Sequence, residues 1–258
     1  MLSYYDNTTY EELKHRANDG DIFSSYLLSW ANLSNVSGFD VSQDYEAGVR
    51  GLKEVWRNGG VDAGYKLYTV YLEGVGVKKD LDVAYDYLIA SAENGFPKSQ
   101  QQLGYVYSGR SYPRILDVSY EDSVLWFSRA ASQGDKLSAV NLSGLYHRGS
   151  GVRQDDQKAF EWISKVEELP YGDPMDGFSG LAKVYEEGIG TDVDLVQAYK
   201  YYDLLSPGSA PDKARLEEQM TPEQIQEAIR LSRQWQEEQN IFVPSYYGLE
   251  YQEDGTFQ

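Results

Sequence analysis

Apolar residues recur along this chain with a nearly constant spacing. Successive repeat leucines are 36, 39 and 39 residues apart, and a tyrosine follows each leucine four positions later. A period in this range is typical of stacked supersecondary units, each of which needs a neighbour to bury its apolar face. The pattern therefore predicts a repeat array rather than a domain with a single core. The repeated pairs are Leu67 with Tyr71, Leu103 with Tyr107, Leu142 with Tyr146, and Leu181 with Tyr185.

One unit shows which structure the period encodes. Apolar residues at helical spacing predict an amphipathic helix over residues 63–74. In the loop after it, Gly74 and Gly76 can both take positive φ, and Asp80 is the predicted N-cap of a second helix. That second helix is expected over residues 80–95, where small and apolar residues share one face. The unit is therefore a predicted helix-turn-helix.

The remaining units follow this template to different degrees. The units that begin at Ser138 and Gly177 match it at seven positions without a gap. The unit from Ser99 keeps the leucine and the tyrosine but has a longer loop, SGRSYPRILDVS, without the second glycine. The first unit, around Tyr26 and Trp30, is more degenerate, and the segment YEELKHRANDG before it resembles half a unit. Because atypical end units cap a stack, we expect an all-α fold of about five helix-turn-helix units.

The composition is that of a folded protein with an acidic surface. Of the 258 residues, 41 are acidic and 23 are basic, which gives a formal net charge of −18. Such a surface repels phosphate backbones and anionic lipid headgroups, so nucleic acid and membrane partners are disfavoured. Two interpretations of the charge stay open: it keeps the protein soluble, or it steers a basic protein towards this one. The lack of cysteine excludes disulfides and thiolate sites.

Several features that invite an enzymatic interpretation are better explained by structure. The G-x-G loops lack the preceding strand and the third glycine of a dinucleotide site. The two histidines, His15 and His147, do not have a metal-binding spacing. The acidic pairs at 155–156, 167–168 and 186–187 are expected at helix starts or on exposed turns, where solvation and the helix dipole explain them. We therefore expect no catalytic residue, no cofactor and no metal site, and no enzymatic activity.

The residues of the repeat carry a family resemblance. The pattern A-x-x-x-L-x-x-x-Y-x-x-G-x-G-V-x-x-D-x-x-x-A-x-x-W/Y-x-x-x-A-A-x-x-G resembles the Sel-1-like repeat, an α/α relative of the tetratricopeptide repeat. The segment MTPEQIQEAIRLSRQW is similar to the helix that closes such arrays, with Thr221 as its predicted N-cap and Gln224 completing a capping box. The resemblance implies a right-handed α/α solenoid whose first helices line the concave surface. It places the array in residues 1–205 and a C-terminal cap of the same domain in residues 206–258, and it implies binding rather than catalysis.

Candidate partner-binding residues follow from the resemblance and from the places where the repeat fails. On the family's geometry Tyr65 and Tyr105 point into the groove, the alternative being burial against the adjacent unit. The long loop carries two cations and a tyrosine, and it is either a binding loop or a harmless longer connection. The aromatic segment 241–258 is expected to fold back onto the array or to dock on a partner. The predicted partner-binding residues are Tyr65, Thr69, Gln101, Tyr105, Arg110, Tyr112, Arg114, His147, Lys183 and Glu186.

Three functional hypotheses fit the sequence. The leading one is a partner-binding protein of the inhibitor or immunity type that neutralises a basic effector, toxin or enzyme. A general scaffold or adaptor is the alternative, and a hydrolase with an unrecognised site is the third. The first residues, MLSYYDNTTYEELK, lack the basic and apolar run of a secretory signal, and no apolar stretch approaches the roughly 18 residues of a membrane span. The expected location is therefore the cytoplasm.

Overall fold

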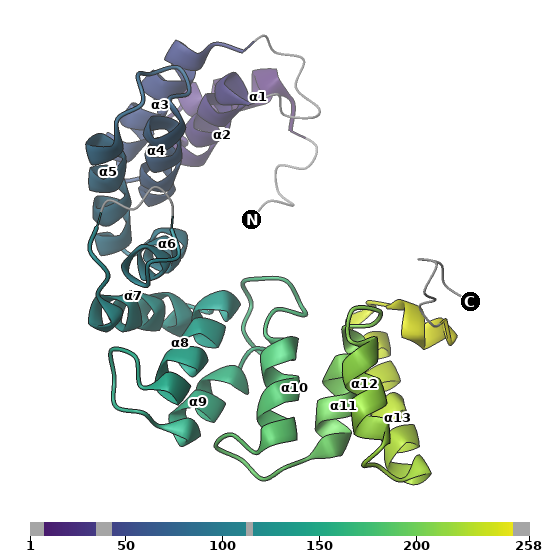
Figure 1. Ribbon diagram of the computed structural model, residues 1–258. Coiled ribbons are helices and arrows are strands. Elements are labelled where there is room, and N and C mark those ends of the chain that lie inside the picture. The colour runs from purple at the N-terminus through teal and green to yellow at the C-terminus, as the bar shows by residue number, and fades with distance from the viewer. Residues whose placement is uncertain (1–7, 35–42, 112–115, 250–258) are drawn as a thin grey trace. The chain divides into compact units, whose positions relative to one another are not determined.

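The fold is all-α, as the sequence predicts. A computed structural model describes residues 8–34, 43–111 and 116–249 (Figure 1). These residues form thirteen α-helices and one 3₁₀-helix, and they contain no β-strand. The chain divides into two compact units, residues 1–118 and 119–258, and each is described by itself. The boundary lies in the long loop whose sequence departs from the repeat.

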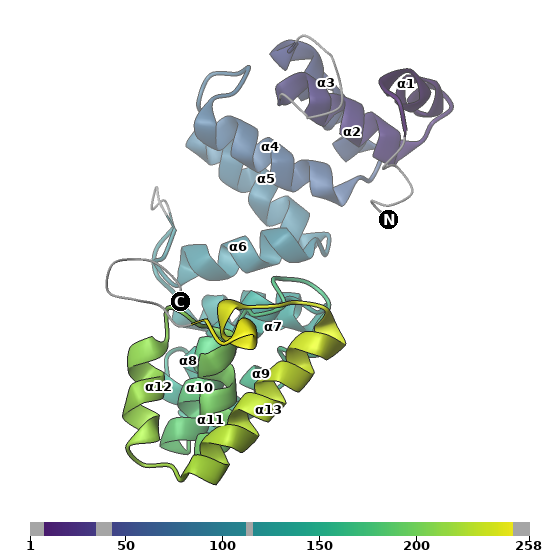
Figure 2. The ribbon, with the colours of Figure 1, turned by 90° about the vertical axis from the view of Figure 1, so that its right-hand side faces the viewer.

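The described part of the first unit contains six helices, each packed against the next along the chain. They are α1 (Tyr10–Asn18), α2 (Ile22–Leu33), α3 (Tyr45–Arg57), α4 (Val61–Glu73), α5 (Leu81–Glu93) and α6 (Pro97–Tyr107). Contact is most extensive between α2 and α3 and between α4 and α5, which lie side by side in both ribbon views (Figure 2). Helix hairpins are therefore the building blocks of this unit.

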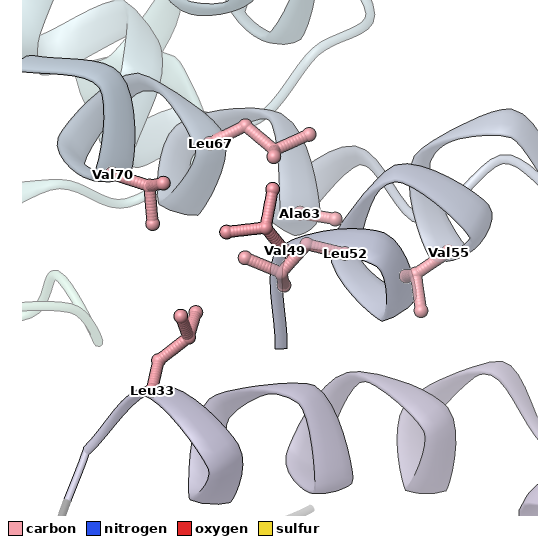
Figure 3. Packing of buried hydrophobic residues seen from close by; sticks show 7 residues of the cluster. All are labelled: Leu33, Val49, Leu52, Val55, Ala63, Leu67 and Val70. Carbon is pink, nitrogen blue, oxygen red and sulfur yellow. The ribbon is translucent and has the colours of Figure 1, made fainter. Parts of the chain in front are cut away.

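The apolar core of the first unit is shared between neighbouring hairpins. The repeat leucine Leu67 is fully buried there, and burial of such a side chain stabilises the fold by roughly 1.5–3 kcal/mol. Because the core is built between consecutive helices, each hairpin depends on the one before it. Figure 3 shows the side chains of α2, α3 and α4 that meet in this core: Leu33, Val49, Leu52, Val55, Ala63, Leu67 and Val70.

The second unit contains seven α-helices and a short 3₁₀-helix within its described residues. They are α7 (Tyr120–Ser132), α8 (Lys136–Arg148), α9 (Asp156–Ile163), α10 (Phe178–Glu187), α11 (Leu195–Leu204), α12 (Ala210–Glu217), α13 (Pro222–Gln239) and η2 (Pro244–Tyr247). The helices α8 and α9 form one hairpin and α10 and α11 the next. A parallel bridge between Asp135 and Tyr171 joins the loop before α10 to the start of α8.

The loop between the two helices of a hairpin has the same geometry in three of the sequence repeats. Its first glycine takes a φ between 65° and 80°, which an L-residue with a side chain rarely adopts. Its aspartate caps the second helix through the side chain, as predicted, and its main-chain N–H donates to the carbonyl oxygen of the repeat tyrosine. The loop therefore fixes the turn between the helices. The N–H to oxygen pairs are Asp80 to Tyr71 at 3.0 Å, Asp155 to Tyr146 at 3.0 Å, and Asp194 to Tyr185 at 2.9 Å.

The second glycine of each loop is a stacking contact between neighbouring hairpins. A Cβ on Gly190 would lie 1.9 Å from the carbonyl oxygen of Asp156, the first residue of α9. A Cβ on Gly151 would lie 2.2 Å from the carbonyl carbon of Tyr120, the first residue of α7. Only glycine allows the loop to approach the preceding helix pair so closely. This packing explains the G-x-G spacing without any phosphate ligand.

The C-terminal helix begins with the predicted cap and closes the second unit. The Thr221 side chain accepts from the Gln224 N–H, and the Gln224 side chain accepts from the Thr221 N–H, which completes the capping box. On the buried side of α13, the ring of Trp235 meets the ring of Phe178 edge-on, with centroids 5.1 Å apart. The helix also packs along α11. It thus covers apolar surface that the last hairpin would otherwise expose.

Candidate protein-interaction site

In the first unit, the candidate Tyr65 is part of the packing between α4 and the start of α6. Its ring lies 5.8 Å from that of Tyr68 and 6.1 Å from that of Phe96, centroid to centroid. The ring is half-buried, and this burial raises the pKa of Tyr65. Thr69, one turn further along α4, donates its hydroxyl hydrogen to the Lys66 carbonyl at 2.8 Å. Much of the Tyr65 ring is therefore used inside the fold, as the alternative interpretation has it.

The candidates on α6 and after it differ widely in exposure. Gln101 is only 3% exposed, and its side-chain oxygen accepts a hydrogen bond from Lys98 Nζ at 2.7 Å. Tyr105 is half-buried, whereas Arg110 is exposed and donates its main-chain N–H to the Tyr105 carbonyl at 3.0 Å. Gln101 therefore has little surface to offer a partner. The loop candidates Tyr112 and Arg114 lie outside the described residues.

In the second unit, two candidates contact acidic side chains at the surface. His147 Nδ1, near the end of α8, lies 2.7 Å from Asp156 Oδ1 at the start of α9. Lys183 is exposed on α10, with its Nζ 3.7 Å from Glu187 Oε1 one turn away. Both side chains remain accessible to solvent. They belong to the second unit, whereas the tyrosine candidates belong to the first.

Glu186 holds three helices of the second unit together, and the expectation of an exposed turn was wrong for this residue. Its side chain is 18% exposed and lies in the last turn of α10. The carboxylate accepts from Arg215 Nε at 3.0 Å and Arg215 Nη2 at 2.9 Å, and from the Tyr202 hydroxyl at 2.8 Å. The two-point contact with the guanidinium of α12 compensates the unfavourable position of an acid at a helix C-terminus. Glu186 is thus a structural residue with little surface left over.

A second buried acid, Asp203 of α11, was not singled out from the sequence. It is 3% exposed, and its carboxylate accepts from Lys213 Nζ at 2.5 Å, from the Ser232 hydroxyl at 2.7 Å and from the Ser245 hydroxyl at 3.1 Å. These donors come from α12, α13 and the segment after α13. The one available indication in the sequence is an aspartate inside the apolar run YKYYDLL, a position that is costly to bury without partners.

The described part of the aromatic tail folds back onto the second unit, as predicted. Val243 is buried, and its N–H donates to Gln236 Oε1 at 2.8 Å. The rings of Phe242, Tyr246 and Tyr247 gather beside it at the surface. The tail residues Tyr251 and Phe257 lie outside the described residues. Within residues 241–249, the main chain and Val243 hold the fold, while the rings of Phe242 and Tyr247 are exposed and that of Tyr246 is half-buried.

The described residues contain neither a cluster of metal ligands nor a membrane-spanning helix. No group of three or more histidine or acidic side chains is placed to hold a metal ion within residues 8–34, 43–111 and 116–249. None of the helices formed by these residues has the length and apolar character needed to cross a membrane. The acidic pairs considered in the sequence serve as a cap at Asp155, and as ion-pair partners at Glu167 with Lys200 and at Glu186.

Comparison with known proteins identifies the repeat. Sel1 repeats match residues 64–96, 97–135, 137–165 and 179–205. They coincide with the helix pairs that follow the leucine and tyrosine period, so the chain belongs to the Sel1 repeat family. The resemblance drawn from the sequence is confirmed. Repeats of this kind mediate protein–protein interactions, and they generally form non-catalytic arrays.

Two relatives and one solved structure are similar to this chain. Activator of C kinase protein 1 of Saccharomyces cerevisiae is 32% identical over 92 residues, which cover 34% of this chain and 15% of that protein. Chitin synthase regulator SKT5 of the same yeast is 27% identical over 153 residues, 55% of this chain and 21% of that protein. The chain therefore matches only a small part of each relative's length. The crystal structure of c5321, a protective antigen of uropathogenic Escherichia coli strains, has a TM-score of 0.73 at 24% identity and covers 93% of this chain and 50% of that one. Its fold is described as the SLR fold, which confirms the predicted solenoid class.

Proposed function

We propose that this chain is a non-catalytic protein-binding array that binds and neutralises a basic protein, such as an effector, toxin or enzyme. The observation that carries the proposal is the uneven distribution of charge. Residues 119–258 contain 25 acidic and 12 basic side chains, a net charge of −13. Residues 1–118 contain 16 and 11, a net charge of −5. An excess of one sign on a protein surface accelerates association with a partner of the opposite sign.

Some basic side chains of the second unit form internal ion pairs, and acidic side chains remain exposed to solvent. Lys213 pairs with the buried Asp203, and Arg215 pairs with the mostly buried Glu186. In contrast, a set of exposed acidic side chains has no ion pair within the described residues of this unit. This surplus supports an acidic docking face on residues 119–258. The set includes Glu168, Asp192 and Glu218.

The names of the relatives agree with a regulatory role. One is an activator of C kinase and the other a regulator of chitin synthase, so each is named for its effect on an enzyme. A repeat array without a catalytic site can act on an enzyme only by binding it or by binding its partners. We extend this mode of action to the present chain, with inhibition as the outcome and a basic protein as the target.

Affinity purification of the full chain from its native cell, at low salt, tests the proposal. We expect a single basic protein in stoichiometric amount, with an association rate that falls as ionic strength rises because salt screens the charges. Adding the purified chain should then block the activity of that protein. Several weak partners without a dominant one would favour the scaffold or adaptor instead. Recovery of no partner would contradict protein binding as the function.

A further inference from the structure

Exposed large apolar side chains concentrate at the C-terminal end of the described residues. Phe242 is 42% exposed, Tyr247 is 65% exposed and Leu249 is 37% exposed, all within eight residues of sequence. This short segment follows α13 and is coloured yellow in Figure 1. A concentration of exposed aromatic side chains in one short stretch is typical of interaction sites rather than of solvated surface.

The three rings of this segment form a preorganised cluster. The centroids of Phe242 and Tyr246 are 4.8 Å apart and meet edge to face, and those of Tyr246 and Tyr247 are 5.2 Å apart with the same geometry. Phe242 and Tyr247 are 6.4 Å apart. Because each ring restrains the others, the rings lose little conformational entropy when a partner binds them. We call these three residues the aromatic cluster.

The segment does not depend on these rings for its attachment to the unit. The Val243 N–H donates to the fully buried side chain of Gln236, and the Ser245 hydroxyl donates to the buried carboxylate of Asp203. Asn240, with a φ of 53°, ends α13 and turns the chain back. The polar groups thus fix the backbone, while the rings keep exposed faces that the fold does not use.

The charges beside the aromatic cluster favour a cationic partner. The Tyr246 hydroxyl donates to Glu237 Oε1 at 3.0 Å, and Glu237 is exposed on α13. Arg233 is close enough to act electrostatically on Tyr246, and Glu237 is the carboxylate in direct contact with the cluster. The surrounding unit carries a net charge of −13. An arginine side chain fits this chemistry because its planar guanidinium stacks on aromatic faces and pairs with a carboxylate.

We propose that the aromatic cluster, together with Glu237, is a docking surface for an arginine-bearing segment of a basic partner protein. This inference rests on the proposed function, since it names the surface through which the basic partner binds. The guanidinium lies over the exposed faces of Phe242 and Tyr247 and faces the Glu237 carboxylate. Lysine carries the same charge but lacks the planar group, so the surface distinguishes the two cations.

Titration of the full chain with two probe peptides, nonaarginine and nonalysine, tests this at one ionic strength. We expect nonaarginine to bind roughly three to ten times more tightly, the ratio that one or two exposed cation–π contacts supply. The double variant Phe242→Ala with Tyr247→Ala should bind both peptides equally. The matched control is Tyr171→Ala, which removes a ring that is 59% exposed elsewhere in the same unit and should keep the arginine preference. Circular dichroism verifies that each variant is folded.

The outcomes separate this inference from the proposed function. Equal affinity for both peptides in the wild type, or a preference that survives in the double variant, would overturn the docking surface while leaving salt-dependent binding of basic peptides intact. Failure of either peptide to bind in a salt-dependent manner would count against the proposed function itself. A wild-type dimer that the double variant converts into a monomer would assign the cluster to a second copy of the chain, and this also overturns the proposal.

Discussion

The hydroxyl of Ser245 donates to the carboxylate of Asp203 at 3.1 Å and so joins the C-terminal segment to α11 across 42 residues of sequence. The same carboxylate accepts from Lys213 and Ser232, so one buried acid connects α11, α12, α13 and the segment that carries the aromatic cluster. A buried charge is tolerated only when it is paired and hydrogen-bonded, as it is here. The position of the aromatic cluster therefore depends on a residue that is itself inaccessible.

Replacement of Asp203 by alanine should strongly destabilise the second unit. The change leaves Lys213 without its carboxylate and the Ser232 hydroxyl without its acceptor, whereas the Ser245 hydroxyl keeps the main-chain oxygen of residue 203. Breaking such a buried pair costs roughly 3–5 kcal/mol. Urea denaturation followed by circular dichroism measures the loss. Asp203→Asn, which keeps an oxygen acceptor but not the charge, should lose less. The exposed Asp192→Ala serves as a control and should stay within about 0.5 kcal/mol of wild type; an equal loss in both alanine variants would contradict the role given to Asp203.

Ser245→Ala should loosen the C-terminal segment and leave the helices intact. The hydroxyl contributes about 1.5–3 kcal/mol as a hydrogen bond to a charged carboxylate, which keeps its other partners. Hydrogen exchange should therefore speed up at the amides of residues 241–249 but not in α11 or α13. Ser164→Ala, whose exposed hydroxyl donates to the Glu161 carbonyl, is the matched control. Faster exchange throughout the unit would show that Ser245 is not a local anchor.

Gly190→Ala should destabilise the stack more than Gly95→Ala. Both glycines have positive φ, at 68° and 93°, so both substitutions incur the strain of a left-handed residue, roughly 1–2 kcal/mol. Only at Gly190 would the new methyl group also lie 1.9 Å from the Asp156 carbonyl oxygen, whereas nothing lies within 4 Å at Gly95. Thermal unfolding compares the two variants. Equal losses would mean that the second glycine serves the turn alone and not the contact between hairpins.

The pH dependence of stability in the first unit should change on Asp62→Asn. Burial raises the pKa of Asp62, and burial together with the nearby Asp62 raises the pKa of Tyr26 to about 12. A carboxyl with a raised folded pKa binds its proton more tightly in the folded state. The stability that proton binding by Asp62 contributes is therefore fully present below the unfolded pKa of about 3.9. It is lost as the pH rises through the folded pKa.

The variant should accordingly gain stability over wild type at pH 7 and differ little at pH 3. Urea unfolding at a series of pH values measures this difference, with the exposed Asp86→Asn as control. A gain that is the same at both pH values would show that the desolvated charge of Asp62 is not the cause.

Features encoded within one repeat were predictable from the sequence, whereas those that depend on distant residues were not. The cap at Asp80 and the turn at Gly74 follow from local chemistry that recurs along the chain, and the structure confirms both. Glu186 was expected on an exposed turn because nothing near it in sequence indicates Arg215, which is 29 residues away. Asp203 was missed for the same reason. Such contacts arise from stacking, which a local pattern does not encode.

The candidate site was predicted less completely than the fold. The expectation for Tyr65 rested on family geometry, with burial against the adjacent unit as the alternative, and the half-buried ring lies near Phe96 of the next helix pair. The aromatic tail was recognised as unusual from its composition, and its described residues do fold back. The outward arrangement of its rings could not be predicted, because it depends on the buried groups that hold the backbone. The sequence thus indicated that this segment is unusual, but not which of its rings are exposed to solvent.

The association rate of the basic partner with charge-neutralised variants tests the central claim most directly. One triple variant, Glu168→Gln with Asp192→Asn and Glu218→Gln, removes three exposed charges from the second unit. Its counterpart, Asp82→Asn with Asp86→Asn and Glu93→Gln, removes three from the first. Stopped-flow measurements over a range of ionic strengths should show slower association and a weaker salt dependence for the first variant than for the second. Equal rates for both variants and wild type would contradict an acidic docking face on residues 119–258.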